Sequence, residues 1–224
     1  MPELRVGFER GSHGGGLLSC PVYVEQGAHN MNRIVRIATM TVAALSLAAC
    51  LLPEKFETSI RFKPDGGYSY KYDGTAVHFI AAAAIKEKGS LPAKDEEGLK
   101  REAEKASKAP GVQKMTYTGN GRYDVRIEEE AKAGQQVHTL RIFGIAREKD
   151  GTFAVTVPAM KEKDRENLRS LGIKVDGKAE VFLPANAKVI EHNATGTPGM
   201  LSKSYSWKIN GFEDRPMIRF ALAQ

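Results

Sequence analysis

A short apolar segment, with basic residues before it and a cysteine after it, divides this chain into parts that cannot all belong to one fold. Arg33 and Arg36 precede residues 37–49, which are uncharged and mostly apolar, and Cys50 follows them. A membrane-spanning helix needs about 20 apolar residues. A basic start, a short apolar core and small residues before a cleavage point are instead typical of a signal peptide. We therefore expect a signal peptide at residues 31–49. The alternative is a short buried helix that ends at an ordinary buried cysteine.

The residues at the cleavage point carry a more specific pattern. Leu47-Ala48-Ala49-Cys50 resembles the lipobox of bacterial lipoproteins at all four positions. The resemblance implies cleavage between Ala49 and Cys50, a diacylglycerol thioether on the Cys50 sulfur, and commonly a third acyl chain such as palmitate on the new amino group. Each buried CH₂ group contributes about 0.8 kcal/mol, so two or more chains give stable attachment to a membrane.

The residues after the cysteine bear on which membrane holds the protein. An Asp directly after the cysteine resembles the inner-membrane retention signal of Gram-negative lipoproteins, and here Leu51 and Leu52 stand there instead. Because this signal is absent, we expect the protein in the cell envelope, anchored in the outer membrane and facing the periplasm.

The boundaries of the signal peptide divide the rest of the chain. Residues 1–30 show no periodicity and precede Met31, an excellent start for a signal peptide, so we interpret them as an upstream extension from a misplaced start codon, disordered if translated. We expect a lipidated tether at residues 50–55. Residues 56–224 then form one domain, large enough to bury roughly 70% of its unfolded surface.

Composition excludes several kinds of site in that domain. No cysteine follows Cys50, so it has no disulfide, thiolate metal site or cysteine nucleophile. Of the 33 basic and 27 acidic residues in the chain, 29 and 24 follow residue 49. Charges of both signs are interspersed, which favours solubility. A weak attraction to anionic phospholipid headgroups near the anchor is the alternative.

Alternating polarity predicts strands over most of this domain. Phe56, Thr58, Ile60 and Phe62 alternate with polar residues, and a turn at residues 64–67 leads to the alternating Tyr68, Tyr70 and Tyr72, which indicates a hairpin. A third strand is expected through Val77, Phe79 and Ala81, within the apolar run 76–85. Further strands are expected at residues 112–117, 122–127, 138–146, 152–157, 173–175, 179–183, 188–192, 205–209 and 217–222.

Two segments have helical character instead. Residues 90–109 contain favourable i,i+4 ion pairs and a thin apolar stripe of Leu99, Ala103 and Ala106, and residues 161–171 end at Gly172. Runs of strands with isolated helices predict an α+β fold: a largely antiparallel β-sheet with two short helices packed on it.

The last third of the chain carries a second resemblance. Leu171-Gly172-Ile173, Val181-Phe182-Leu183-Pro184, Val189-Ile190-Glu191 and Tyr205-Ser206-Trp207-Lys208-Ile209 resemble the LppM-type domain of bacterial envelope lipoproteins, although Ala185 replaces the usual glycine after Pro184. The resemblance implies an α+β envelope domain with an apolar ligand cavity, and it implies no catalytic residues.

Aromatic residues are the candidates for ligand binding. Tyr68, Tyr70 and Tyr72 face one way, and Trp207 is the only tryptophan, so the four could line an apolar groove for a lipid or peptide. The alternative is core and cross-strand packing, which aromatic residues favour.

The sequence contains no pattern typical of a metal site, a catalytic nucleophile or a phosphate-binding loop. His78, His138 and His192 have no short ligand spacing, even with Glu128-Glu129-Glu130 or Glu191 nearby, so we expect no metal and no cofactor. The domain contains no Gly-x-Ser-x-Gly nucleophile elbow. Gly119-Asn120-Gly121 is expected to form a turn, and it is not followed by the helix that a phosphate-binding loop needs. We expect no enzyme activity and no nucleic-acid partner.

These observations predict a membrane-anchored envelope lipoprotein whose partner is the membrane, through acyl chains on Cys50. Its role would be that of a non-catalytic module that binds a lipid or another envelope ligand. The alternative is a structural or assembly partner of another envelope protein, which would need an exposed apolar patch or an open sheet edge.

Overall fold

The computed structural model describes residues 51–137, 140, 142–200 and 202–223. The interpretations of residues 1–30, of the signal peptide at 31–49, and of Ala49, Cys50 and His138 therefore concern residues outside the described ones.

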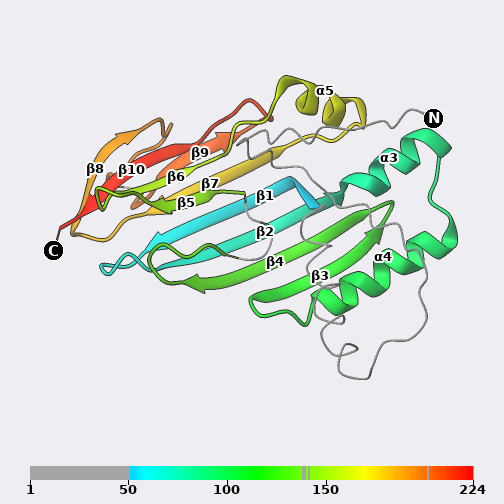
Figure 1. The fold of residues 1–224 in the computed structure, drawn as a ribbon, viewed down its shortest axis with the longest axis horizontal. Helices are drawn as coiled ribbons and strands as arrows, with labels where there is room; N and C mark the ends of the chain where they lie inside the picture. The colour runs from blue at the N-terminus through cyan, green and yellow to red at the C-terminus, as the bar shows by residue number, and fades with distance from the viewer. Residues whose placement is uncertain (1–50, 138–139, 141, 201, 224) are drawn as a thin grey trace, which may run out of the picture.

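A six-stranded sheet forms the larger part of the fold (Figure 1). Its strand order is β3-β4-β2-β1-β7-β9, and every neighbouring pair is antiparallel except β1 and β7, which run parallel. The strands are β1 (Leu51–Phe62), β2 (Tyr68–His78), β3 (Val112–Gly119), β4 (Arg122–Ala131), β7 (Asp176–Phe182) and β9 (Tyr205–Ile209).

A smaller antiparallel sheet of four strands has the order β5-β6-β10-β8. Its strands are β5 (Gly144–Arg147), β6 (Phe153–Thr156), β8 (Ala187–His192) and β10 (Met217–Leu222). Phe62 from β1 meets Phe153 and Phe220 of this sheet, with ring centroids 5.9 and 4.8 Å away. This aromatic cluster places side chains of both sheets in one hydrophobic core.

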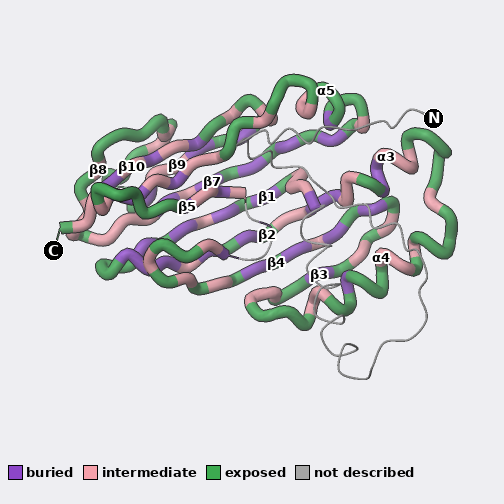
Figure 2. The backbone as a smooth tube through the Cα atoms, in the orientation of Figure 1, coloured by how far each residue is buried: buried purple, intermediate pink, exposed green. Residues whose placement is uncertain are grey.

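The alternation expected from the sequence is visible along the strands, where buried and exposed positions follow one another (Figure 2). Most side chains of β1, β2 and β4 that point inward are apolar or aromatic, and most on the other face are polar, because successive residues of a strand face opposite sides of the sheet. Thr58 is a buried exception, and its hydroxyl donates to the Lys71 carbonyl oxygen at 2.8 Å. The α+β class and the largely antiparallel sheet are confirmed.

The described residues contain three helices, not the two expected: α3 (Phe79–Lys88), α4 (Ala93–Ala106) and α5 (Glu162–Ser170). The two expected helices are confirmed as α4 and α5. Leu99, Ala103 and Ala106 of α4 pack against the core as the stripe predicts, with Ala103 buried.

The third strand expected through Phe79 and Ala81 is wrong, because the chain turns into α3 there. Four consecutive alanines favour a helix. His78 caps it, since its Nδ1 accepts a hydrogen bond from the Ala81 amide at 3.2 Å, and Gly89 ends it at a positive φ of 82°. The apolar run 76–85 is therefore divided between the end of β2 and a helix.

Two other expectations about local structure also change. Residues 51–55, expected as a tether, form the first part of β1, where Leu51 is 6% exposed and pairs with His78. Residues 173–175 lie outside the strands, but Ile173 is buried with Val77, Ala82 and Leu168 in a second small core. At the end of the large sheet where β1 begins, α3 and α5 thus cover the face that is polar elsewhere.

Candidate functional site

The three candidate tyrosines lie in the core. Tyr68, Tyr70 and Tyr72 expose 0–1% of their surface. Their hydroxyls donate to backbone carbonyl oxygens of Gln135, Leu140 and Thr75, respectively, at 2.7–3.0 Å. Burial raises the pKa of the Tyr70 and Tyr72 hydroxyls well above the ordinary value. These side chains support packing, which is the alternative that the sequence left open.

Trp207, the fourth candidate, is also largely buried. It is 5% exposed, and its indole nitrogen donates to Asn193 Oδ1 at 2.8 Å. It nevertheless borders a hollow on the sheet, as Tyr72 borders a smaller one. The structure thus distributes the four aromatic residues over the interior of the sheet and does not bring them together around one described cavity.

The larger hollow is an open groove of about 680 Å³ across β1, β2, β7 and β9. Most of its side chains occupy the polar positions of the alternating strands, so the groove lies on the solvent-facing side of the sheet. Its lining consists of Lys55, Phe56, Glu57, Asp73, Asp176, Gly177, Lys178, Thr195, Ser206, Trp207 and Lys208.

A smaller hollow of about 320 Å³ continues it across β1, β2 and β4 and shares Glu57 and Asp73 with it. Cross-strand ion pairs neutralise much of this region: Lys71 Nζ lies 2.7 Å from Glu128 Oε1, and Arg126 Nη2 lies 2.6 Å from Asp73 Oδ2. The two hollows together make one trough, which we call the charged trough.

Four charged side chains of the trough are left without such pairs. Lys55, Glu57, Asp176 and Lys208 make no ion pair with any other described residue. Two cations and two anions in an open groove suit a ligand that carries both signs of charge. Sequence reasoning missed these residues because charged residues that alternate along a strand are typical of an ordinary solvated sheet face. Only the pairing of β1 with β7 places Lys55 beside Asp176.

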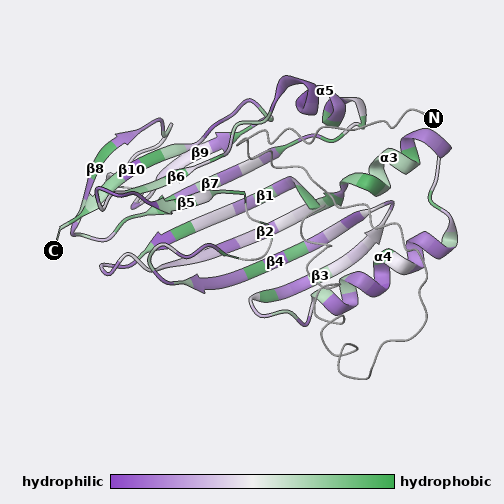
Figure 3. Cartoon of the chain, viewed as in Figure 1, coloured by the Kyte–Doolittle hydropathy of each residue, from purple (hydrophilic) through white to green (hydrophobic). Residues whose placement is uncertain are grey.

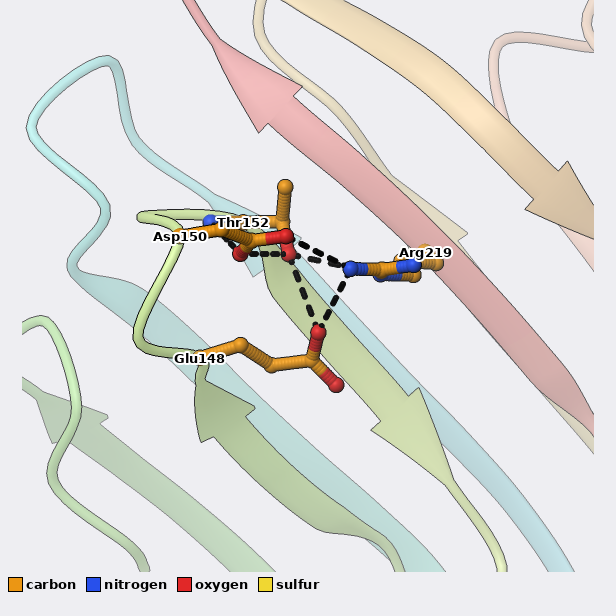
Figure 4. Close-up of polar contacts among 4 residues, drawn as sticks. All are labelled: Glu148, Asp150, Thr152 and Arg219. Atoms are coloured by element: carbon orange, nitrogen blue, oxygen red, sulfur yellow. Dashed lines mark hydrogen bonds and ion pairs between the residues drawn. The ribbon is translucent and has the colours of Figure 1, made fainter.

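Other polar clusters have structural roles. Figure 4 shows Arg219 of β10 reaching the β5–β6 turn, where its Nη2 lies 2.8 Å from Glu148 Oε2 and 2.7 Å from Asp150 Oδ2. Thr152 closes the network, since its hydroxyl lies 2.6 Å from Asp150 Oδ1. The hydrogen bonds to Thr152, with Arg219 nearby, hold the pKa of the Asp150 carboxyl below its usual value. Each partner is satisfied within the network, so this cluster fastens a hairpin.

The described histidines do not form a cluster. His78 caps α3, and burial lowers its pKa, while His192 packs against Tyr205 with ring centroids 4.9 Å apart. In the described part of the chain, no group of three or more His, Cys, Asp or Glu side chains is arranged to hold a metal ion. No helix in that part is long and apolar enough to span a bilayer.

No protein-family model and no curated protein matches this chain. Among solved structures, it is similar to the NMR structure of the folded domain of the Mycobacterium tuberculosis protein LppM. The TM-score is 0.35 and the sequence identity is 11%, over 76% of this chain and 91% of that chain.

Proposed function

We propose that this chain is a lipid-anchored, non-catalytic binding module of the bacterial cell envelope, held through Cys50 in the outer membrane and facing the periplasm. Its ligand is an envelope component with charges of both signs, bound in the charged trough. The observation that carries the proposal is the set of unpaired residues Lys55, Glu57, Asp176 and Lys208 around a groove of about 680 Å³. An apolar lipid acyl chain suits the trough poorly, since charged side chains at its surface would lose hydration without gaining partners.

The anchor is tested by the Cys50→Ser variant. The parent protein should fractionate with membranes and show an intact mass for residues 50–224 plus acyl chains, whereas the variant should carry no acyl chain. A parent chain that retains residues 1–49 would overturn the anchoring.

The binding role is tested by native mass spectrometry of the acylated protein extracted from its own membrane. A stoichiometric bound mass should be present in the parent and lost in Lys55→Glu/Lys208→Glu. It should be kept in Lys105→Glu/Lys149→Glu, which makes the same change of charge at exposed positions on α4 and the β5–β6 turn. A bound mass that survives both changes would contradict binding in the trough, and a phospholipid mass would identify a lipid ligand instead.

A second candidate function, an assembly partner, is favoured by the edge of the small sheet. Among the described strands, β8 pairs only with β10. Every residue of β8 is half-buried or exposed, and Ile190 is 51% exposed. An unpaired edge can accept a strand from another protein. Replacing Val189 by Pro would remove an amide donor from this strand. Loss of a co-purifying protein in that variant, with the trough ligand retained, would support this role.

A further inference from the structure

Helix α3 begins where the proposed anchor joins the sheet. β1 starts at Leu51, one residue after Cys50, and Leu51 pairs with His78, the residue that caps α3. Directly opposed residues of an antiparallel pair lie about 5 Å apart between Cα atoms. The acylated sulfur would therefore be separated from this end of the sheet by little more than one residue, which spans at most about 3.6 Å.

The absence of slack at residues 51–55 has a physical consequence. A flexible tether would let the domain stand away from the bilayer, but these residues are hydrogen-bonded into β1. Surfaces around Leu51 must then lie against the lipid headgroups once the acyl chains are inserted. In Figure 1, α3 lies at the end where β1 begins, and β8 lies at the opposite end of the molecule.

The surface of α3 is suited to that position. Its first seven residues, Phe79–Ile85, are all apolar, and Figure 3 shows the first part of α3 as hydrophobic. A run of seven residues goes nearly twice around a helix, so apolar side chains face both the small core and the outside. Ala81 and Ala82 are buried, whereas Ile80 is 51% exposed and Ala83 and Ala84 are only half-buried. Helical spacing places Ile80, Ala83 and Ala84 on one outer face.

Charged residues follow at the end of the helix. Lys86 and Lys88 flank Glu87, and Lys86 donates to the Ser170 carbonyl oxygen of α5. Lys88 is exposed and can extend its ammonium group to lipid headgroups while its methylene stem lies along apolar surface. The outer side of α3 is therefore apolar along its first two turns and ends at the exposed Lys88, a combination that can lie against lipid headgroups.

We infer that the outer face of α3, formed by Ile80, Ala83 and Ala84, lies in the bilayer interface and holds the domain at a defined orientation to the membrane. This inference rests on the proposed anchor at Cys50. It adds a second contact, which stops the domain from rotating about the acyl chains.

The chain offers a matched pair of positions for the test. No cysteine follows Cys50, so Ile80→Cys supplies the single free thiol of the acylated protein. Ile190→Cys is the control, because Ile190 is likewise 51% exposed but lies on β8 at the other end of the molecule. Ala84→Cys, one turn along α3, serves as a second probe if Ile80→Cys disturbs folding. Each variant carries a nitroxide label and is reconstituted in vesicles that contain anionic phospholipid.

The readout is the accessibility of the label to oxygen relative to a nickel chelate, with intact mass and flotation measured on the same sample. When acyl chains are present and the protein floats, the ratio of oxygen accessibility to chelate accessibility should be several-fold higher for the labels on α3 than for the label at position 190. A floating protein with the α3 labels in water overturns the inference and leaves the anchor standing. Labels hidden from both reagents show α3 covered by protein, which also overturns it. No acyl mass and no flotation overturn both.

Discussion

At the residue scale, two buried tyrosines differ in whether their hydroxyl has a hydrogen-bond partner, and this difference changes what the hydroxyl contributes to the free energy of folding. The hydroxyl of Tyr70 is buried and donates to the Leu140 carbonyl oxygen at 3.0 Å. The hydroxyl of Tyr123 is equally buried but has no hydrogen-bond partner in the described part of the chain. A buried polar group without a partner costs free energy, whereas a paired one is close to neutral or stabilising.

Removing these two hydroxyls should therefore have different effects. Tyr70→Phe should lower the free energy of unfolding by about 1 kcal/mol, because it breaks the buried hydrogen bond to the Leu140 carbonyl oxygen. Tyr123→Phe should leave stability unchanged or raise it. Urea denaturation of both variants measures the difference, and an equal loss in the two would show that Tyr123 has a partner after all.

Tyr117 leads to a prediction about pH. Burial, followed by its hydrogen bond to Glu96, raises its pKa from 10.0 to about 12. Above pH 10 the unfolded chain loses this proton while the folded chain keeps it, so stability should fall as the pH rises from 10 to about 12. Urea unfolding at a series of pH values should give a shallower fall in Tyr117→Phe than in the parent. An unchanged slope would contradict the assignment.

At the element scale, close approach of the backbone decides which substitutions a strand or helix accepts. β1 has an irregularity between Pro53 and Phe56, and Gly74 of β2 lies against it. A Cβ at Gly74 would lie 2.2 Å from the Lys55 carbonyl oxygen, whereas one at Gly98 of α4 would meet nothing within 4 Å.

The same substitution should thus have opposite signs at these two glycines. Gly74→Ala should destabilise by about 1–3 kcal/mol, since the backbone of β1 must shift. Gly98→Ala should stabilise by about 0.5–1 kcal/mol, because alanine favours a helix interior. Thermal or urea unfolding checks both. A stable Gly74→Ala variant would mean that β1 and β2 do not approach so closely.

The β5–β6 turn should depend on Arg219. Arg219→Met leaves Glu148 and Asp150 without their cation, so the unfolding midpoint should fall, and by less at high salt. The pKa of Asp150 is lowered in the folded state, so its stabilising contribution is present above its ordinary pKa of 3.8 and is lost as the pH falls further. Arg101→Met, which breaks the exposed pair with Glu97, is the control and should have a smaller effect.

At the scale of the whole molecule, the two sheets share one core. Phe62 contributes from the large sheet, and Phe153 and Phe220 stack with centroids 5.4 Å apart in the small one. Because the main core contains residues of both sheets, we expect the domain to unfold as a unit.

Phe220→Ala tests this expectation. Phe220 is fully buried, so its truncation should cost about 3–5 kcal/mol. Far-UV circular dichroism and the fluorescence of Trp207, which lies on β9 of the large sheet, should show one coincident transition at lower denaturant. Two separated transitions would show that the sheets fold independently.

Much of the fold follows from local pattern. Alternation along residues 56–62 and 68–72 predicts strands with the observed inward faces, and the i,i+4 pairs and apolar stripe of residues 90–109 predict α4. These features depend on neighbours in the sequence. The prediction of a strand through Phe79 and Ala81 failed because a short apolar segment suits either a strand or a helix. The four alanines, the cap by His78 and the burial of Ala82 in the second core together favour α3.

The sequence by itself determined the alternating strands, the α+β class and the cysteine-free domain, because these depend on residue identity and spacing. The resemblance of Leu47-Ala48-Ala49-Cys50 to a lipobox still supplies the expectation of an anchor at Cys50. Only the tertiary structure decided that β1 pairs in parallel with β7, that residues 51–55 join the sheet, and that Tyr68, Tyr70 and Tyr72 are core residues. The physical reason is that long-range pairing brings distant segments together, and which charges remain unpaired is settled only by that pairing.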